Sequence, residues 1–252
     1  MSQIKKNRMQ RWSPSYLRNQ GHMSKRQKHI FRQNWPIYGL TLEYNKKIAL
    51  QELFSTSSYL VLEIGFGQGE HILARSRKEP QHNFLGIEVH KPAIANVLKN
   101  IHHPNIRIIK SDALVVLADH MPLDCLDEVC IFFPEPWDEK NSHRRILREQ
   151  TISYLEPALK NGAHLFFATD IASYATKVLE LMESTAGWKN IHEVYAPRHP
   201  WRPISKYEKK GMAAEREIYN LSFVFTKERL SKSSSSLSKC SSQTDFFPNS
   251  RD

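Results

Sequence analysis

The chain has 252 residues, a formal net charge of +10 and 40% hydrophobic residues, a length that suits one α/β domain with a sizeable core and short appendages. No apolar run approaches the roughly 20 residues of a membrane span, and the N-terminus lacks the apolar core of a secretory signal. Three cysteines form no C-x-x-C pair and have no histidines at ligand spacing, so we expect free thiols, no metal site, no membrane contact and a cytoplasmic protein.

The N-terminal segment carries most of the net charge. Residues 1–42 contain nine lysines and arginines and no acidic residue. Aromatic side chains such as Trp12, Tyr16 and Trp35 are interleaved with them, a mixture suited to phosphates and unstacked bases. A charge run is often only a solvated face. We interpret residues 1–34 as a partly flexible arm that contacts nucleic acid.

The elements that follow predict a Rossmann-like α/β fold. Ser24 is a candidate N-cap for a helix that begins at Lys25 and is interrupted by Pro36, and residues 41–53 show a helical pattern that would cover a sheet edge. From residue 59, strands and helices alternate, which predicts a mostly parallel seven-stranded sheet with helices on both faces. The expected strands are 59–64, 83–89, 106–111, 128–133, 163–169, a strand near 190–196 and 217–226, the last pair antiparallel. The expected helices are 70–77, one that begins near Pro92, 113–120, 145–160 and 172–185. We therefore place the main domain at 35–228 and a Ser-rich, disordered tail at 229–252.

A glycine-rich turn follows the first of these strands. Gly65, Gly67 and Gly69 remove Cβ atoms where the backbone turns sharply, and the next helix start offers free N–H groups to a polar ligand. The spacing is G-x-G-x-G rather than the dinucleotide pattern G-x-G-x-x-G, and Glu63 lies two residues before it. That carboxylate would repel a pyrophosphate and favour a cationic amine, as in S-adenosylmethionine. An ordinary strand–helix loop is the simpler alternative.

Further carboxylates fall at the ends of the expected strands, where open α/β sheets bind ligands. Glu88 lies 19 residues after Gly69, a distance suited to ribose hydroxyls. Asp112 is a candidate acceptor for an adenine amine and equally a candidate helix N-cap, and Asp170 follows the fifth strand. Together with Glu63 they favour a nucleoside-bearing cofactor.

The fourth expected strand ends in FFPEPWDEKNSHRR. Two prolines fix the loop, so Glu135 between them is expected to be held rigidly, and Trp137 offers a stacking face. Phosphate contacts are expected from four residues: Lys140, His143, Arg144 and Arg145. We interpret this loop as a base pocket that faces the cofactor, the alternative being a rigid surface loop with a solvated basic patch.

Several motifs together resemble those of bacterial tRNA (guanine-N7-)-methyltransferases. They are SYLRNQGHMSKRQ, LEIGFGQG, GIEVH, FFPEPW with HRR, ATD and RPISKYEKKG, in that order between about Tyr16 and Phe225. The resemblance implies an S-adenosylmethionine-dependent enzyme that methylates N7 of the variable-loop guanine, position 46, of tRNA.

The resemblance also implies roles for single residues. It gives cofactor contacts to Glu63, Glu88 and Asp112, and an active-site carboxylate to Glu135. The positions that contact tRNA are Asp170, Ser205, Lys206, Tyr207 and Glu208. We expect Glu135 and Asp170 to act in catalysis, and the cofactor also to contact Glu135 and the glycines.

This chain departs from the family pattern at four positions. Glu135 stands where aspartate is usual, and Glu139 stands where the family has a substrate-binding lysine, in a loop one residue shorter. Lys140 is then the expected replacement for that lysine. Ser205 and Tyr207 replace threonine and phenylalanine but keep the hydroxyl and the ring.

Two other interpretations compete with a tRNA methyltransferase. One is a non-catalytic RNA-binding protein on a decayed methyltransferase fold, supported by Glu139 and the shortened loop. The other is a nicotinamide-dependent dehydrogenase, disfavoured by the glycine spacing and the basic arm. The sequence does not specify an oligomeric state.

Overall fold

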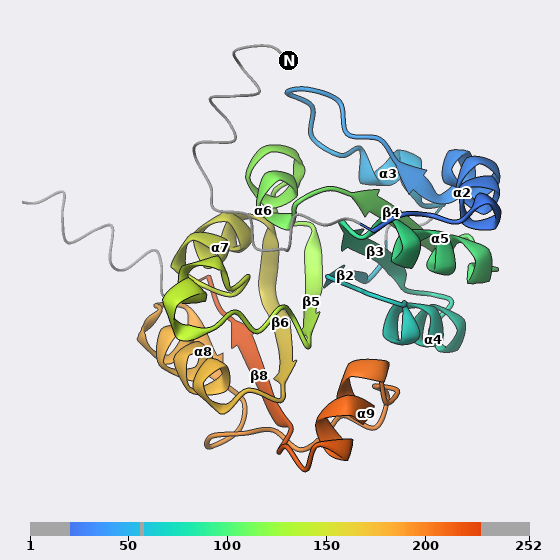
Figure 1. Cartoon of the computed structure of the whole chain (residues 1–252). Coiled ribbons are helices and arrows are strands. Elements are labelled where there is room, and N and C mark those ends of the chain that lie inside the picture. Colours follow the sequence, from blue (N-terminus) through green and yellow to red (C-terminus); the bar gives the residue numbers. More distant parts are fainter. Residues whose placement is uncertain (1–20, 56–57, 228–252) are drawn as a thin grey trace, which may run out of the picture.

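The computed structural model describes residues 21–55 and 58–227. In these ranges eight strands form one sheet in the order β1-β4-β3-β2-β5-β6-β8-β7 (Figure 1). The strands are Gly39–Leu40 (β1), Leu60–Ile64 (β2), Asn83–Glu88 (β3), Ile106–Lys110 (β4), Leu126–Phe132 (β5), Leu159–Thr169 (β6), Trp188–Asn190 (β7) and Tyr219–Phe225 (β8). All pairs from β1 to β6 are parallel, whereas β8 pairs antiparallel with β6 and β7. The predicted fold class and the antiparallel last pair are confirmed.

Helices cover both faces of the sheet. The helices are Lys25–Tyr38 (α2), Leu50–Leu53 (α3), Glu70–Lys78 (α4), Lys91–Asn100 (α5), Ala113–Val115 (α6), Glu149–Leu155 (α7), Ala172–Ser184 (α8) and Lys206–Ala213 (α9). Shorter turns are a π-helical turn at Val116–His120 and 3-10 turns at Glu139–Arg144 and Glu156–Ala158. Figure 1 shows α2, α4 and α5 together on one side and α6, α7 and α8 on the other. Within the described ranges, no helix combines the length and apolarity needed to cross a membrane.

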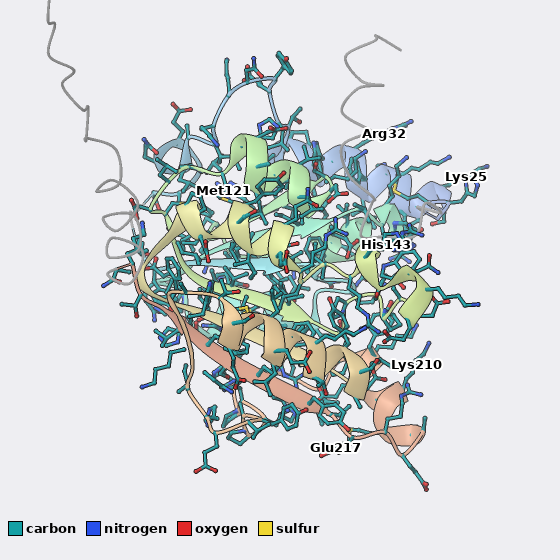
Figure 2. The ribbon with its side chains drawn as sticks, turned by 90° about the vertical axis from the view of Figure 1, so that its left-hand side faces the viewer. Lys25, Arg32, Met121, His143, Lys210 and Glu217 are labelled. Atoms are coloured by element: carbon teal, nitrogen blue, oxygen red, sulfur yellow. The ribbon has the colours of Figure 1, made fainter. Side chains whose placement is uncertain are left out.

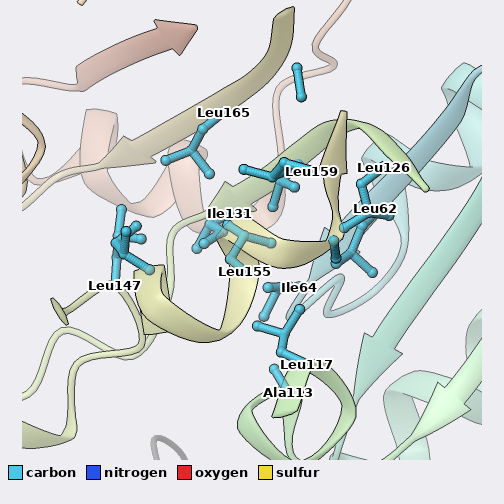
Figure 3. Close-up of a cluster of buried hydrophobic side chains, with 14 of the residues drawn as sticks. Leu62, Ile64, Ala113, Leu117, Leu126, Ile131, Leu147, Leu155, Leu159 and Leu165 are labelled. Carbon is cyan, nitrogen blue, oxygen red and sulfur yellow. The ribbon is translucent and has the colours of Figure 1, made fainter. Parts of the chain in front are cut away.

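The two faces of β2 belong to two different cores because side chains alternate along a strand. Leu62 and Ile64 pack into the core beside α6 and α7, and Figure 3 shows them among Leu117, Leu155 and other apolar side chains. Val61 belongs to the opposite core, with residues of α4 and α5. By this alternation Glu63 faces α4, beneath the glycine turn.

The N-terminal elements differ from the sequence prediction. Pro36 lies inside α2, which continues to Tyr38, because a proline one turn before the helix end removes only one late hydrogen bond and Trp35 stacks on Phe31 across that turn. The predicted helix 41–53 is wrong over most of its length. Asn45 has a φ of 57°, which suits a turn rather than a helix. Just before this segment, Gly39–Leu40 pairs with β4 as a short edge strand that was not predicted. The sheet therefore has eight strands rather than seven.

Two later boundaries also differ, and one helix was not predicted. The predicted helix 145–160 is shorter, because Leu159 already pairs with Leu126 and Gly162, with a φ of 81°, lies within β6 instead of ending a helix. The strand expected near 190–196 ends at Asn190. The sequence pattern missed α9. Residues 1–20 of the arm 1–34, expected to be partly flexible, and the whole of the tail 229–252 lie outside the described residues.

The order of the strands reverses between β2 and β5. The chain moves from β2 to β3 and β4 on one side, and β5 then pairs with the other side of β2. In open α/β sheets, ligands bind at the carboxyl ends of the strands beside such a switch point. The carboxyl ends of β2 and β5 carry the glycine turn and the proline loop, respectively.

Candidate functional site

The three glycines of the turn adopt left-handed backbone conformations. The φ angles of Gly65, Gly67 and Gly69 are 74°, 53° and 82°. A Cβ on Gly69 would lie 2.3 Å from Cγ2 of Val97, so this glycine allows α4 to approach α5. A Cβ on Gly65 would meet nothing within 4 Å. The turn is therefore packed tightly on its inner side and open on its outer side.

Glu88 joins the end of β3 to this turn. Its Oε2 accepts a hydrogen bond from the Gly67 N–H at 3.0 Å, and its Oε1 accepts from the N–H groups of Val89 and His90 at 2.7 and 2.9 Å. A carboxylate has about four acceptor positions, so Glu88 can still accept from ribose hydroxyls while it fixes the turn.

Glu63 is buried beside a histidine that the sequence analysis did not select. Nδ1 of His71 lies 2.9 Å from Oε2 of Glu63, and the two residues are 5% and 4% exposed. Both line a small pocket with Phe66, Gln68, Phe133 and Pro203. The pocket has a volume of about 40 Å³ and is partly open to solvent.

Asp112 caps the helix that follows β4. Its Oδ1 accepts from the Leu114 N–H at 2.9 Å, as expected for an N-cap. Burial raises the pKa of Asp112 above its ordinary value, and the Leu114 hydrogen bond and the charge of Arg148 act against that rise. The carboxylate is thus already engaged with the backbone, and any adenine amine would share it.

The proline loop after β5 is held from beneath by Arg145, which is 3% exposed. Its Nε donates to the Pro136 carbonyl at 3.0 Å, and its Nη2 donates to the Trp137 carbonyl at 3.1 Å. Its guanidinium also packs over the ring of Tyr174. Trp137 has a φ of 34°, a conformation that costs free energy unless its surroundings enforce it. Arg145 is therefore a structural clamp rather than the phosphate contact that the sequence suggested.

Glu139, which replaces the family lysine, is neutralised by its neighbours. Its carboxylate pairs with Lys177 of α8 and lies 3.1 Å from Nη2 of Arg145. Hydrogen bonds from Lys177 and Ser173 lower the pKa of Glu139. Glu139 therefore links the loop after β5 to α8 and adds little net negative charge to the surface. Lys140 follows it and is exposed.

Tyr207 lines the pocket, and Glu135 lies within electrostatic range of Tyr207. Loss of water around its carboxyl raises the pKa of Glu135, and the charge of Glu88 raises it further. Burial raises the pKa of Tyr207, and Glu135, Glu88 and Glu70 add to this rise. A Cβ on Gly67 would lie 3.7 Å from the Tyr207 ring. The loop, α9 and the turn thus surround one carboxylate-rich opening.

The four residues at the start of α9 have distinct contacts. Ser205 caps the helix by accepting from the Glu208 N–H at 3.1 Å, and the Lys206 N–H donates to Oε1 of Glu70 at the same distance. Glu208, however, is 1% exposed. Its carboxylate pairs with Nη1 of Arg202 at 2.8 Å and with Nε of Arg198 at 2.9 Å.

Asp170 lies after β6 at the same edge of the sheet. Its Oδ2 is 2.8 Å from Nε and 2.7 Å from Nη2 of Arg216, and its side chain is 16% exposed. The structure therefore brings Glu63, Glu88, Glu135 and Tyr207 around one opening and places Asp170 and α9 at the same edge. Among the described residues, no group of three or more histidines, cysteines or acids is arranged to hold a metal ion.

Sequence reasoning missed the buried partners of this site. The sequence indicates only weakly that His71 belongs to the site, because it lies in the first helical turn after the glycines, facing the strand that carries Glu63. Arg202 begins the motif RPISKYEKKG, but only the fold brings its guanidinium against Glu208 and over the ring of Phe132.

Comparisons with known proteins agree with this arrangement. A family model described as a putative methyltransferase matches residues 57–221. A protein of Francisella philomiragia named tRNA (guanine-N(7)-)-methyltransferase is 34% identical over 213 residues, covering 83% of this chain and 93% of its own. A protein of Marinobacter nauticus with the same name is 36% identical over 218 residues, covering 84% and 91%.

Solved structures extend the comparison to the fold. The 16S rRNA methyltransferase KamB matches with a TM-score of 0.56 and 14% identity, over 75% of this chain and 98% of its own. The aminoglycoside resistance methyltransferase NpmB1 gives a TM-score of 0.52 and 16% identity over the same shares. The fold of this chain is thus the Rossmann-like fold of class I methyltransferases. The family match and the curated relatives go further, and the chain belongs to the tRNA (guanine-N(7)-)-methyltransferase family.

Proposed function

We propose that this protein transfers the methyl group of S-adenosylmethionine to N7 of a guanine in tRNA, and that the guanine is position 46 of the variable loop. One observation carries the proposal: a buried carboxylate lies beneath an open glycine turn, and Glu135 interacts electrostatically with Glu88, which binds that turn. Family membership supports tRNA as the acceptor. When bound, S-adenosylmethionine supplies an electrophilic methyl group on a sulfonium.

The residues of the turn fit such a cofactor. Glu63 supplies a buried anion for the amine of the methionine part, Glu88 supplies acceptors for ribose hydroxyls, and Asp112 supplies one for the adenine amine. Nε2 of His71 and Nε of Arg202 are buried without a hydrogen-bond partner in the structure, and both residues line the pocket. Such atoms are usually paired with a ligand or water, so the pocket is built to hold a polar group.

Guanine N7 needs no general base. It carries an in-plane lone pair that accepts hydrogen bonds and is not used in Watson–Crick pairing. Holding N7 in line with the methyl group is then the main source of rate, and good positioning can contribute roughly 7–11 kcal/mol. The guanine gains positive charge as the methyl is transferred. We assign Glu135 and Asp170 to accept from its N1–H and N2–H and to stabilise this charge.

The proposal is tested with the purified full chain, labelled S-adenosylmethionine and unmodified tRNA, with 7-methylguanosine as the product measured. A tRNA with adenine in place of guanine 46 is the matched substrate control. We expect product only with the guanine. Binding of tRNA without product would instead support the non-catalytic RNA-binding alternative.

The rate of methyl transfer is expected to fall with acid at a higher pH than an ordinary glutamate pKa of about 4.3 would give. The reason is that lost hydration and the Glu88 charge raise the pKa of Glu135. Folding raises the pKa of Glu135, so its protonated form adds to the free energy of unfolding at pH values below the ordinary glutamate pKa. This contribution is lost as the pH rises through the raised pKa of the folded protein.

The measurement is kcat against pH at saturating cofactor. Glu88→Gln removes the repulsion and should move the acid limb to lower pH, whereas Glu135→Gln should lower kcat and abolish the limb. Glu135→Asp tests whether the shorter acid usual in the family also works. An acid limb that Glu135→Gln leaves in place would show that another group controls it.

A cationic face supports tRNA binding. In Figure 2 the side chains of Lys25, Arg32, His143 and Lys210 project on the same side of the molecule. A Cβ on Gly21 would lie 2.7 Å from Nε2 of His90, so α2 begins close to the carboxyl end of β3. We propose that the basic arm 1–34 contacts tRNA and includes the first part of α2.

Replacing Lys25, Lys28 and Arg32 with glutamine should weaken tRNA binding and flatten its salt dependence, by about 0.7–0.9 in the log–log slope for each phosphate that is no longer neutralised. These residues are exposed, and their spacing places them on one face of α2. Fluorescence anisotropy of labelled tRNA over a potassium chloride series measures the slope.

The control is the double variant Arg77→Gln, Lys78→Gln, whose residues lie in the last turn of α4, a helix that does not pack on α2. Substitution is preferred to deletion of residues 1–34, because Asn34 Nδ2 donates to the Leu98 carbonyl at 2.8 Å and α2 packs on α5. Equal slopes for both variants and the natural chain would contradict a role for α2 in tRNA binding.

A further inference from the structure

His71 directly contacts Glu63, the buried acid that lines the pocket. It lies in the first turn of α4, eight residues after Glu63, and its Nδ1 is 2.9 Å from Oε2 of that carboxylate. Its ring is enclosed by Phe132, edge-on with centroids 4.9 Å apart, and by Trp201, with centroids 5.3 Å apart. Its other nitrogen, Nε2, is buried and has no hydrogen-bond partner in the structure.

The charged groups around this ring are engaged elsewhere. Arg75 lies over Trp201 and pairs with Glu79 and Glu128, and Arg202 lies over Phe132 and pairs with Glu208. The remaining titratable neighbours are His199, which stacks on Trp201 and has a pKa lowered by burial, and Cys130, whose thiol has a pKa raised well above its ordinary value by burial. Glu70 on the same turn of α4 accepts from the Lys206 N–H. Glu63 is thus the ionisable group in direct contact with His71.

We propose that His71 is a positioning residue that sets the orientation and the net charge of Glu63, and so controls how strongly the pocket binds a cationic amine. The inference rests on the proposed function of this pocket as the site for the methionine part of the cofactor.

The two protonation states of His71 differ in what they leave for the amine. Neutral imidazole with its proton on Nδ1 donates to Glu63 and leaves a full negative charge on the carboxylate. An imidazolium at the same place neutralises that charge before the amine arrives. The imidazolium and the amine of the ligand are then two cations about 6 Å apart that share one carboxylate. At an intermediate dielectric their repulsion weakens binding of the amine by about tenfold or more.

The test is isothermal titration calorimetry with S-adenosylhomocysteine, which has the amine and carboxylate of the cofactor, between pH 7.5 and 5.5, across most of the range of about pH 5 to 8 in which histidine changes charge. For the natural chain, we expect affinity to fall by about tenfold towards the acid end. His71→Asn has an amide N–H in place of Nδ1–H but cannot become charged. This variant should retain its affinity for S-adenosylhomocysteine at pH 7.5 and show no decrease in affinity at acid pH. Any effect of the titration of the ligand amine itself is common to both proteins and cancels in the comparison.

Two further measurements separate positioning from structure. His71→Leu has no donor and should bind S-adenosylhomocysteine more weakly at both pH values, while thermal unfolding reports whether each variant is folded. Methylthioadenosine lacks the amine and the carboxylate, so His71→Asn should leave its affinity and pH dependence unchanged.

The outcomes distinguish the inference from the function on which it rests. Tight binding of S-adenosylhomocysteine with the same pH dependence in the natural chain and in His71→Asn retains the cofactor site and overturns the role of His71. A pH effect of equal size with methylthioadenosine also overturns it. A natural chain that binds neither ligand overturns the proposed function and, with it, the inference.

Discussion

Replacing Asp170 with alanine is expected to lower methyl transfer to tRNA by about 100- to 1000-fold, the usual effect of removing one group that stabilises charge in a transition state. Binding of S-adenosylmethionine should be nearly unchanged, because Asp170 follows β6, whereas the proposed cofactor contacts Glu63, Glu88 and Asp112 lie at the carboxyl ends of β2, β3 and β4. Single-turnover assays with saturating tRNA give the rate, and calorimetry gives the cofactor affinity.

Arg216 provides the matched control for this variant. Both Nε and Nη2 of Arg216 bind the same oxygen of Asp170, so Arg216→Gln disturbs the pair but leaves the carboxylate in place. If Asp170 acts on the guanine, Arg216→Gln should lose far less activity than Asp170→Ala. Asp170→Asn keeps the shape without the charge and should resemble the alanine variant. Equal losses of activity and cofactor affinity in Asp170→Ala would contradict the division of roles.

The sequence predicted the parts of this protein that local patterns determine. The strands β2 to β6 and β8, the glycine turn and the acids at strand ends follow from apolar runs, glycine conformations and the rule that ligands bind at the carboxyl edge of a parallel sheet. The cap at Ser24 is likewise local, and the structure has both hydrogen bonds of the capping box with Gln27.

The sequence did not predict features that depend on contacts between distant residues. Glu139 is an anion beside the expected RNA surface, yet Lys177, on another element, balances it. Arg145 belongs to a basic motif, yet the fold buries it against Tyr174 and the carbonyls of the proline loop. In both cases the residue type indicates charge, while its partners in the fold decide whether that charge contacts RNA or holds a loop.

Glu208 gives the sharpest test of this distinction, because the family resemblance assigns it to tRNA whereas the structure buries it. Glu208→Gln should destabilise the protein by about 3–5 kcal/mol, since removing one partner of a buried ion pair leaves Arg202 charged and uncompensated. Burial already lowers the pKa of Arg202, with Glu208 acting against that effect. At about 2–4 °C per kcal/mol for a chain of this size, the melting temperature should fall on the order of 10 °C.

Thermal and urea unfolding measure this loss, and the exposed Glu183→Gln on α8 is the control that removes an acid without a buried partner. The double variant Arg202→Met, Glu208→Leu should be more stable than Glu208→Leu alone, because apolar side chains can replace a whole buried pair but not half of one. A variant that keeps its melting temperature and loses only tRNA affinity would instead place Glu208 at the RNA surface. From the buried pair we expect loss of stability to come before loss of tRNA binding. The fold around α9 weakens first, and tRNA binding is then lost because Ser205, Lys206 and Tyr207 are no longer held against the glycine turn.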